Sequence, residues 1–235
     1  MVFKIRITAV LAVVLSVAVL STAVTTGYKY ISVSAAYKNR NTVILDAGHG
    51  GFDGGAVASD GTVEKDINLK ITLAVAKFLR QSGFNVVLTR ENDVSTDDVE
   101  TEKISTRKKS DLKNRLNLMK DYKDAVFVSI HLNKFTTSAA NGSQVFYSRS
   151  EESKRLGDCI QKSIVAKLQP ENTRVNKLAT SSTYLLYNAT VPSVLVECGF
   201  LSNKSELEKL KDQDYQNKMA FSIYCGILEY FKGEK

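Results

Sequence analysis

The sequence contains few histidines and cysteines and none of the short motifs that usually identify a catalytic or metal-binding site. Its 235 residues include two histidines and three cysteines. Cys159, Cys198 and Cys225 are odd in number and lack CxxC spacing, so they predict neither a disulfide framework nor a cysteine zinc knuckle. The signatures HExxH, GxGxxG, GxxxxGK[ST] and GxSxG are absent, as are internal repeats and low-complexity segments. Any chemistry must therefore come from residues that lie far apart in the sequence.

The excess of positive charge is small once the amino terminus is set aside. Lys4, Arg6 and Lys29 supply three of the net +7, and no acidic residue precedes Tyr37, so residues 37–235 carry +4. This charge is compatible with an ordinary soluble surface or with attraction to an anionic polymer of the cell envelope. The basic residues are not interleaved with aromatic residues, which disfavours nucleic acid as a partner.

The amino terminus has the pattern of an export signal or a membrane anchor. Lys4 and Arg6 precede an uncharged apolar run over residues 7–24. Its 18 residues are few for a spanning helix and many for the apolar core of a signal peptide, so both interpretations stay open. We therefore assign residues 1–36 to a signal peptide or membrane anchor and residues 37–235 to one outward-facing catalytic domain. If the segment is not cleaved, it attaches the domain to the membrane.

The remaining pattern predicts a single α/β domain, because apolar runs of strand length alternate with helical periodicities. We expect a twisted, mostly parallel but mixed sheet of about six strands flanked by helices. Strands are predicted at residues 43–45, 85–89, 125–131, 142–147, 184–187 and 191–197. Helices are predicted at residues 64–81, 111–122, 151–168 and 214–231, with polar loops at residues 92–109, 134–141 and 171–183.

Three of the predicted strands end in a group that binds metals or moves protons. The run VILDAGHGGFDGG, residues 43–55, places His49 in a glycine-rich loop directly after a buried strand. The run AVFVSIHLN ends its apolar part at His131, and VLVECGF leads into Glu197. If the strands are parallel neighbours, the three side chains meet at one edge of the sheet, where α/β proteins bind ligands.

Two imidazoles and a carboxylate suit a divalent transition metal, above all zinc. Glu64 begins the first predicted helix and can point into the same cleft as His49. We assign His49, Glu64 and His131 to the metal and Glu197 to proton transfer, because the base should lie beside the metal without ligating it. From the residues alone, the choice of carboxylate ligand stays open among Glu64, Asp46, Asp53 and Glu197.

The motifs also resemble a known family. In order and rough spacing, the chain is similar to the zinc-dependent N-acetylmuramoyl-L-alanine amidases of the amidase_3 type, from Thr42 to about Leu207. The resemblance rests on DAGHGGFDGGA, EKDINL, LTREND, NR at residues 114–115, VSIHLN and VPSVLVECGFLSN. In that family the corresponding residues are three zinc ligands and a catalytic base, which fall on His49, Glu64, His131 and Glu197.

The resemblance implies hydrolysis of the amide between the lactyl group of N-acetylmuramic acid and the L-alanine of the peptidoglycan stem peptide. The chain looks most like the CwlD-type amidases of sporulation, which act in the spore cortex before germination on the way to muramic-δ-lactam. We therefore expect an extracytoplasmic protein, secreted or membrane-anchored, in the cortex space around the forespore. Its partners would be glycan strands, stem peptides and an accessory envelope protein or lipoprotein, with residues 92–109 and 134–141 as candidate surfaces. The competing interpretations are a catalytically silent wall-binding protein and a zinc carboxypeptidase.

Overall fold

The computed structural model describes residues 41–233. Every element described below lies in one compact unit that begins at Asn41. The predicted signal or anchor in residues 1–36 lies outside the described residues, so the boundary near Tyr37 stays a prediction. No helix within residues 41–233 is both long and apolar enough to cross a bilayer.

The centre of the domain is a six-stranded sheet in the order β2-β1-β3-β6-β4-β5. The strands are β1 (Thr42–Ala47), β2 (Asn85–Leu88), β3 (Ala125–Asn133), β4 (Gln144–Tyr147), β5 (Lys177–Leu178) and β6 (Ser193–Phe200). Strands β2, β1, β3 and β6 pair in parallel, β4 runs antiparallel to β6, and β5 is parallel to β4. The predicted mixed, mostly parallel α/β sheet is therefore confirmed.

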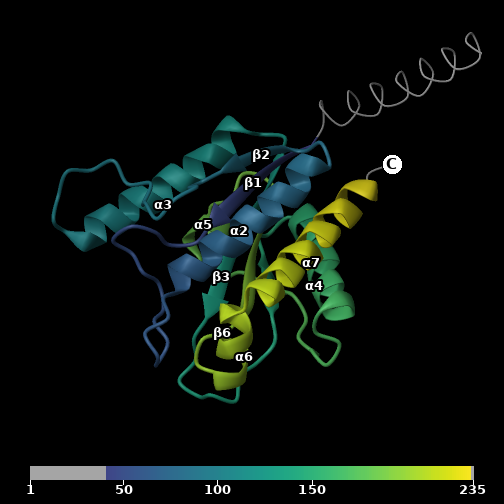
Figure 1. Ribbon diagram of the computed structural model, residues 1–235. Coiled ribbons are helices and arrows are strands. Elements are labelled where there is room, and N and C mark those ends of the chain that lie inside the picture. Colours follow the sequence, from purple (N-terminus) through teal and green to yellow (C-terminus); the bar gives the residue numbers. More distant parts are fainter. Residues whose placement is uncertain (1–40, 234–235) are drawn as a thin grey trace, which may run out of the picture. The chain divides into compact units, whose positions relative to one another are not determined.

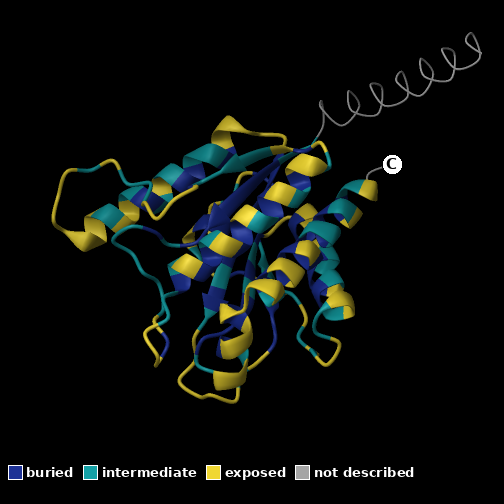
Figure 2. Cartoon of the chain, viewed as in Figure 1, coloured by how far each residue is buried: buried dark blue, intermediate teal, exposed yellow. Residues whose placement is uncertain are grey.

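Helices cover the two faces of the sheet unequally. On one face, α2 (Glu64–Gln81), α4 (Glu151–Lys167) and α7 (Gln213–Lys232) enclose the larger hydrophobic cluster. Figure 1 shows α2 and α7 side by side on the near side of the strands. The other face has a smaller cluster under α3 (Ile104–Asp121) and α5 (Tyr184–Tyr187). The central strands β1, β3 and β6 are largely buried, whereas the outward faces of the helices are exposed (Figure 2).

Two elements differ from the predictions. Residues 184–187 form helix α5 rather than a strand, because an apolar run of four residues fits either state and only its packing decides. Helix α3 begins at Ile104 and not near Asp111, so the predicted loop at residues 92–109 is helical in its last part. Its first turns are exposed and therefore lack apolar periodicity, although lysine and arginine are good helix formers.

Two further elements were not predicted. The two-residue strand β5 lies inside the polar stretch 171–183, and helix α6 (Lys204–Lys211) follows β6. The side chain of Asn203 caps α6 by accepting from the amides of Ser205 and Glu206. Both elements are too short for their hydrophobic pattern to identify them.

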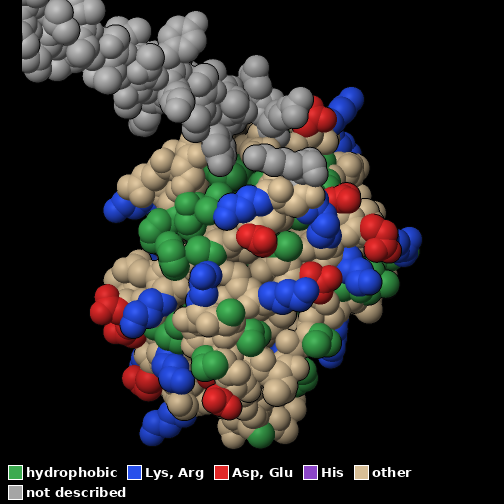
Figure 3. All heavy atoms as spheres, turned by 90° about the vertical axis from the view of Figure 1, so that its right-hand side faces the viewer, with side chains coloured by type: hydrophobic (Ala, Val, Ile, Leu, Met, Phe, Trp, Pro, Cys, Tyr) green, Lys and Arg blue, Asp and Glu red, His purple; other side chains and the backbone are tan. Residues whose placement is uncertain are grey.

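The mild charge of the domain is spread over its surface. In the view of Figure 3, which shows the side of α7 and α4, basic and acidic side chains are interspersed, and hydrophobic side chains gather in one patch at the upper left. Neither histidine is visible on this face. Mixed charges of this kind favour an ordinary solvated surface here over a polyanion-binding one.

Candidate active site

The three predicted site strands are parallel neighbours, and this brings their ends together. Strand β3 lies between β1 and β6, and His131 is the register partner of Glu197. After β1, the amide of Gly48 donates to the carbonyl of Ile130 at 3.0 Å, which places the glycine-rich loop beside the end of β3. The predicted convergence of His49, His131 and Glu197 at one sheet edge is confirmed.

His49 is held in an unusual backbone conformation with φ of +63°. Its Nδ1 donates to Asp53 Oδ2 at 2.9 Å, which leaves Nε2 to face Glu64 Oε1 at 3.3 Å. Gly48 and Gly55 allow this approach. A Cβ at residue 48 would lie 2.3 Å from the His131 ring, and one at residue 55 would lie 2.6 Å from both Glu64 Oε2 and the His49 ring.

Glu64 is buried at the first residue of α2 and is surrounded by donors. Its Oε2 accepts from the amide of Ala56 at 2.8 Å, and its Oε1 accepts from the amide of Leu132 and from Asn68 Nδ2, both at 3.1 Å. His131 Nδ1 lies 3.1 Å from the same Oε1. These contacts keep the carboxylate ionised and aim it between the two imidazoles.

The electrostatics of this cluster favour a positive charge at its centre. Burial opposes protonation of His49, but hydrogen bonds to Asp53 and Glu64 outweigh it and raise the pKa of His49 to about 9. Burial likewise opposes ionisation of Glu64, and hydrogen bonds from His131 and His49 nevertheless hold its pKa well below the usual range. The cluster therefore binds a proton tightly. A metal cation at its centre would likewise compensate the negative charge of Glu64.

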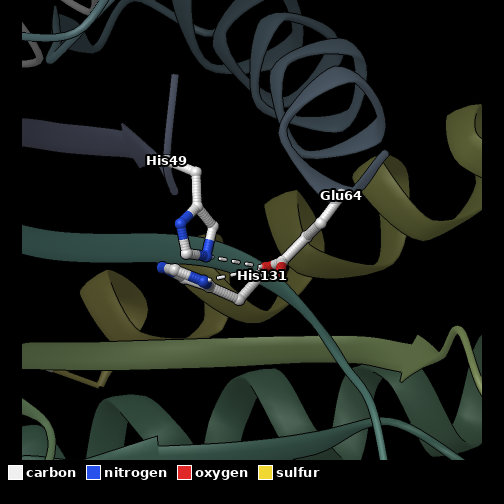
Figure 4. Close-up of side chains that lie close together, drawn as sticks. All are labelled: His49, Glu64 and His131. Carbon is white, nitrogen blue, oxygen red and sulfur yellow. Dashed lines mark hydrogen bonds and ion pairs between the residues drawn. The ribbon is translucent and has the colours of Figure 1, made fainter. Parts of the chain in front are cut away.

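The donor set fits a transition metal. One ligand atom each from His49, Glu64 and His131 lies within 4.8 Å of the others. Figure 4 shows the two rings and the carboxylate converging from the loop after β1, from β3 and from the start of α2. Two imidazole nitrogens and one carboxylate oxygen are a common zinc set, and Asp53 orients His49 from behind as outer carboxylates do in such sites.

The structure decides which carboxylate belongs to the metal-binding cluster, a choice that the sequence left open. Asp46 is fully buried and paired with Arg115, and Asp53 binds the outer nitrogen of His49, so neither belongs to the cluster. Of the four carboxylates, Glu64 alone lies within the metal-competent group found among residues 41–233.

Glu197 lies beside the cluster and differs sharply from Glu64. Its Oε2 is buried and has no hydrogen-bond partner within the described part of the chain. Burial, reinforced by the negative charge of Glu64 and opposed by the two histidines, raises the pKa of Glu197 to about 7. A carboxyl group in this state is suited to exchange protons near neutral pH.

Two arginines that sequence reasoning did not assign hold the histidine loop in place. Arg115 Nη1 donates to the carbonyl of Ala47 at 2.9 Å, and its Nη2 donates to that of His49 at 2.8 Å. Arg90 donates to the carbonyls of Ala47 and Gly48 at 2.9 and 3.1 Å. Their only sequence signal was membership in the motifs LTREND and NR, because an isolated arginine does not reveal which carbonyls it will reach.

A cavity of about 250 Å³ opens beside the cluster on the α3 side. It is lined by His49 and His131, by Lys108 and Leu112 of α3, and by Leu185 of α5. Lys108 forms an ion pair with Asp53 at 2.9 Å across this cavity. The histidines are therefore accessible to a ligand that enters between the sheet edge and α3.

Comparisons with known proteins agree with this geometry. The family model of Amidase_3, N-acetylmuramoyl-L-alanine amidase, matches residues 43–229. A germination-specific N-acetylmuramoyl-L-alanine amidase of Bacillus subtilis (strain 168) is 39% identical over 190 residues, which are 80% of this chain and 79% of that protein.

Solved structures match the fold over most of the described domain. The CwlD amidase of Clostridioides difficile, in complex with the GerS lipoprotein, has a TM-score of 0.79 and 44% identity, covering 82% of this chain and 99% of that one. The amidase AmiC2 of Nostoc punctiforme has a TM-score of 0.69 and 32% identity, covering 81% and 97%.

The buried pair of Asp46 and Arg115 predicts how stability depends on pH. Burial alone would raise the pKa of Asp46, but the charge of Arg115 and a hydrogen bond from Ser129 lower it overall. Because the folded pKa is depressed, the stabilisation is present above the unfolded value of about 3.9 and is lost as the pH falls below it. Asp46→Asn should therefore destabilise the protein by about 3 kcal/mol at pH 7, and the difference should shrink in acid.

Urea unfolding of both proteins between pH 7 and pH 3 measures this. Asp124→Asn, which changes an exposed carboxylate before β3, is the matched control and should follow the unchanged protein. A constant difference between Asp46→Asn and the parent at all pH values would contradict the ionic account of the pair.

Proposed function

This chain belongs to the Amidase_3 family and is an N-acetylmuramoyl-L-alanine amidase of the cell wall, and from that premise we propose a zinc-dependent hydrolysis carried by Glu197. The amide cleaved would join the lactyl group of N-acetylmuramic acid to the L-alanine of the stem peptide. The observation that supports the proposal most is the contrast between two neighbouring carboxylates. Glu64 accepts hydrogen bonds from two backbone amides and lies against the two histidines, whereas Glu197 Oε2 is buried and has no hydrogen-bond partner among residues 41–233.

In this proposal, His49 Nε2, His131 Nδ1 and a Glu64 oxygen hold the metal. Bound zinc would supply a Lewis acid that polarises the scissile carbonyl and makes water more acidic. Asp53 keeps the Nδ1 proton of His49 and thereby fixes the nitrogen that faces inward. Arg115 and Arg90 hold the loop carbonyls so that His49 keeps its position.

Glu197 carries the proton through the reaction. It accepts a proton from the attacking water and returns that proton to the nitrogen of L-alanine as the carbon–nitrogen bond breaks. The second proton of the water also goes to this nitrogen, so the products are the carboxylate of the lactyl group and the protonated amine of the stem peptide, and atoms and charge balance. A pKa near neutrality suits a group that must both accept and release a proton.

Mass spectrometry of muropeptides tests the proposal directly. The full chain should release intact stem peptides from purified peptidoglycan with zinc present, and chelation should abolish this release until zinc is restored. Glu197→Gln should lower kcat at least about 10³-fold at any zinc concentration, because the amide cannot accept the proton.

Two controls make this result specific. Glu197→Gln should still bind one zinc per chain, whereas His131→Ala should not, as measured by metal analysis after gel filtration. Release of single amino acids rather than whole stems would indicate a carboxypeptidase. Zinc-loaded parent protein that binds peptidoglycan without releasing anything would indicate a silent wall-binding protein.

We propose further that the enzyme acts in the spore cortex, outside the cytoplasmic membrane, on the way to muramic-δ-lactam. This proposal is supported by the 39% identity to a germination-specific amidase and the 44% identity to CwlD. The predicted signal or anchor in residues 1–36 would export the domain to that space. Deletion of the gene in its spore-forming host should remove muramic-δ-lactam from the cortex. Wild-type chain should restore it and the Glu197→Gln chain should not, whereas lactam at normal levels in the deletion strain would refute the cortex role.

An accessory envelope lipoprotein is proposed as a partner, because the CwlD structure contains one. The candidate surfaces expose large apolar side chains, namely Val94, Ile104 and Phe135, which are 51%, 60% and 53% exposed. Affinity capture of the tagged chain from sporulating envelopes should recover a lipid-anchored protein, and the Ile104→Ser/Phe135→Ser variant should lose it. Equal recovery by both chains, or recovery of no such protein, would count against these surfaces.

A further inference from the structure

The sheet face that bears the active site has an apolar, half-exposed surface over strands β6, β4 and β5. On this face Glu197 is in register with Gln144, and two residues earlier Leu195 is in register with Phe146. Phe146 is in turn the register partner of Lys177 on β5. Since alternate residues of a strand share a face, these five residues form a continuous surface, which we call the open strip.

The apolar residues of the open strip are not part of the core. Leu195 and Phe146 are half-buried and belong to neither of the two hydrophobic clusters. By contrast, Ile44 on β1 and Phe127 on β3 lie on the same face and are fully buried in the smaller cluster, which α3 and α5 cover. Gln144 within the strip is buried, so the half-exposed part of the open strip is formed by Leu195 and Phe146, next to the proposed catalytic base.

The cations around the open strip are free of carboxylates. Arg174 donates to Gln144 Oε1 at 3.2 Å, and Lys177 is exposed. Within residues 41–233, neither of these two forms an ion pair with an acidic side chain. On the α3 side of the site the cations are neutralised, as Lys108 is by Asp53 and Arg107 by Asp97.

The direction of the substrate follows from the role of Glu197, and this step rests on the proposed function. A base that returns its proton to the leaving amine must lie on the amine side of the scissile bond. The peptide that continues from that amine therefore leaves the metal over β6 and β4. The lactyl group and the glycan then lie toward His49 and the cavity beside α3.

We propose that the open strip is the binding site for the stem peptide beyond L-alanine, and that Lys177 recognises a carboxylate of that peptide. The apolar floor of Leu195 and Phe146 would contact its aliphatic parts. Lys177 lies two strands away from Glu197 across the sheet and two residues away along the strand direction. At ~4.8 Å per strand and ~7 Å per two residues, their Cα atoms are about 12 Å apart. At ~3.5 Å per extended residue this distance corresponds to about three residues, so Lys177 lies near the third residue of the stem.

The test compares two substrates in the full chain. One is an N-acetylmuramoyl peptide with an acidic tripeptide stem, and the other is N-acetylmuramoyl-L-alanine, which has no stem residue beyond alanine. Lys177→Glu should lower the ratio of their kcat/KM values about tenfold, and Lys177→Gln about threefold, through KM for the acidic substrate. Lys77→Glu, a charge reversal of an exposed lysine on α2 on the opposite face, should leave the ratio unchanged.

A binding measurement separates this proposal from the amidase mechanism. Calorimetry with the free acidic tripeptide should show weaker binding to Glu197→Gln/Lys177→Glu than to Glu197→Gln alone. If the chain binds the peptide in this Lys177-dependent way but cleaves neither substrate, the mechanism fails and the open strip stands. An unchanged ratio and unchanged peptide binding would overturn the open strip even in an active enzyme. A Lys177 effect that follows glycan length instead of stem charge would also overturn it.

Discussion

The structure of the site depends on one buried ion pair. Asp46, at the carboxyl end of β1, and Arg115, on α3, meet at 2.6 Å in the interior, and Arg115 also binds Asp111. The remaining donors of Arg115 reach the carbonyls of Ala47 and His49, so the charge that neutralises Asp46 also fixes the loop that carries a metal-site histidine. Removing one partner of such a pair leaves an uncompensated charge in the core, which costs more than the pair itself contributes. The same constraint ties the helix, the strand and the left-handed conformation of His49 into one unit.

Two carboxylates at the sheet edge acquire opposite properties because their surroundings differ. Glu64 accepts from two amides and from Asn68 and lies against both imidazoles, so it stays ionised. The Oε2 of Glu197 is buried and has no hydrogen-bond partner among residues 41–233, and the nearby charge of Glu64 disfavours a second negative charge. Environments that move the pKa values of neighbouring acids apart also separate their roles, one as a ligand and one as a proton carrier.

Helices cover the sheet unequally on the two sides of the site, and this determines how a ligand can lie across it. On the face that bears His131 and Glu197, α3 and α5 close the part over β1 and β3 and leave Leu195 and Phe146 half-exposed on β6 and β4. A ligand can therefore lie across the edge with one end in the cavity beside α3 and the other on the open strip. On the first side Lys108 and Arg107 are paired with carboxylates. On the second side neither Lys177 nor Arg174 forms an ion pair within residues 41–233, so the two ends are chemically distinct.

The sequence alone determined the strand ends and their chemical groups, because a buried strand followed by a histidine or glutamate is a local pattern. It also placed Glu64 at the start of α2, as the structure does. It left the choice of carboxylate ligand open among Glu64, Asp46, Asp53 and Glu197. It also did not identify the roles of Arg90 and Arg115 or the helical state of residues 184–187. Those features depend on which strands are neighbours, on their register and on what packs above them, and no local pattern encodes these relations. Only the tertiary structure brings Arg115 to the carbonyl of His49, 66 positions away, and leaves Leu195 beside Glu197 without a covering helix.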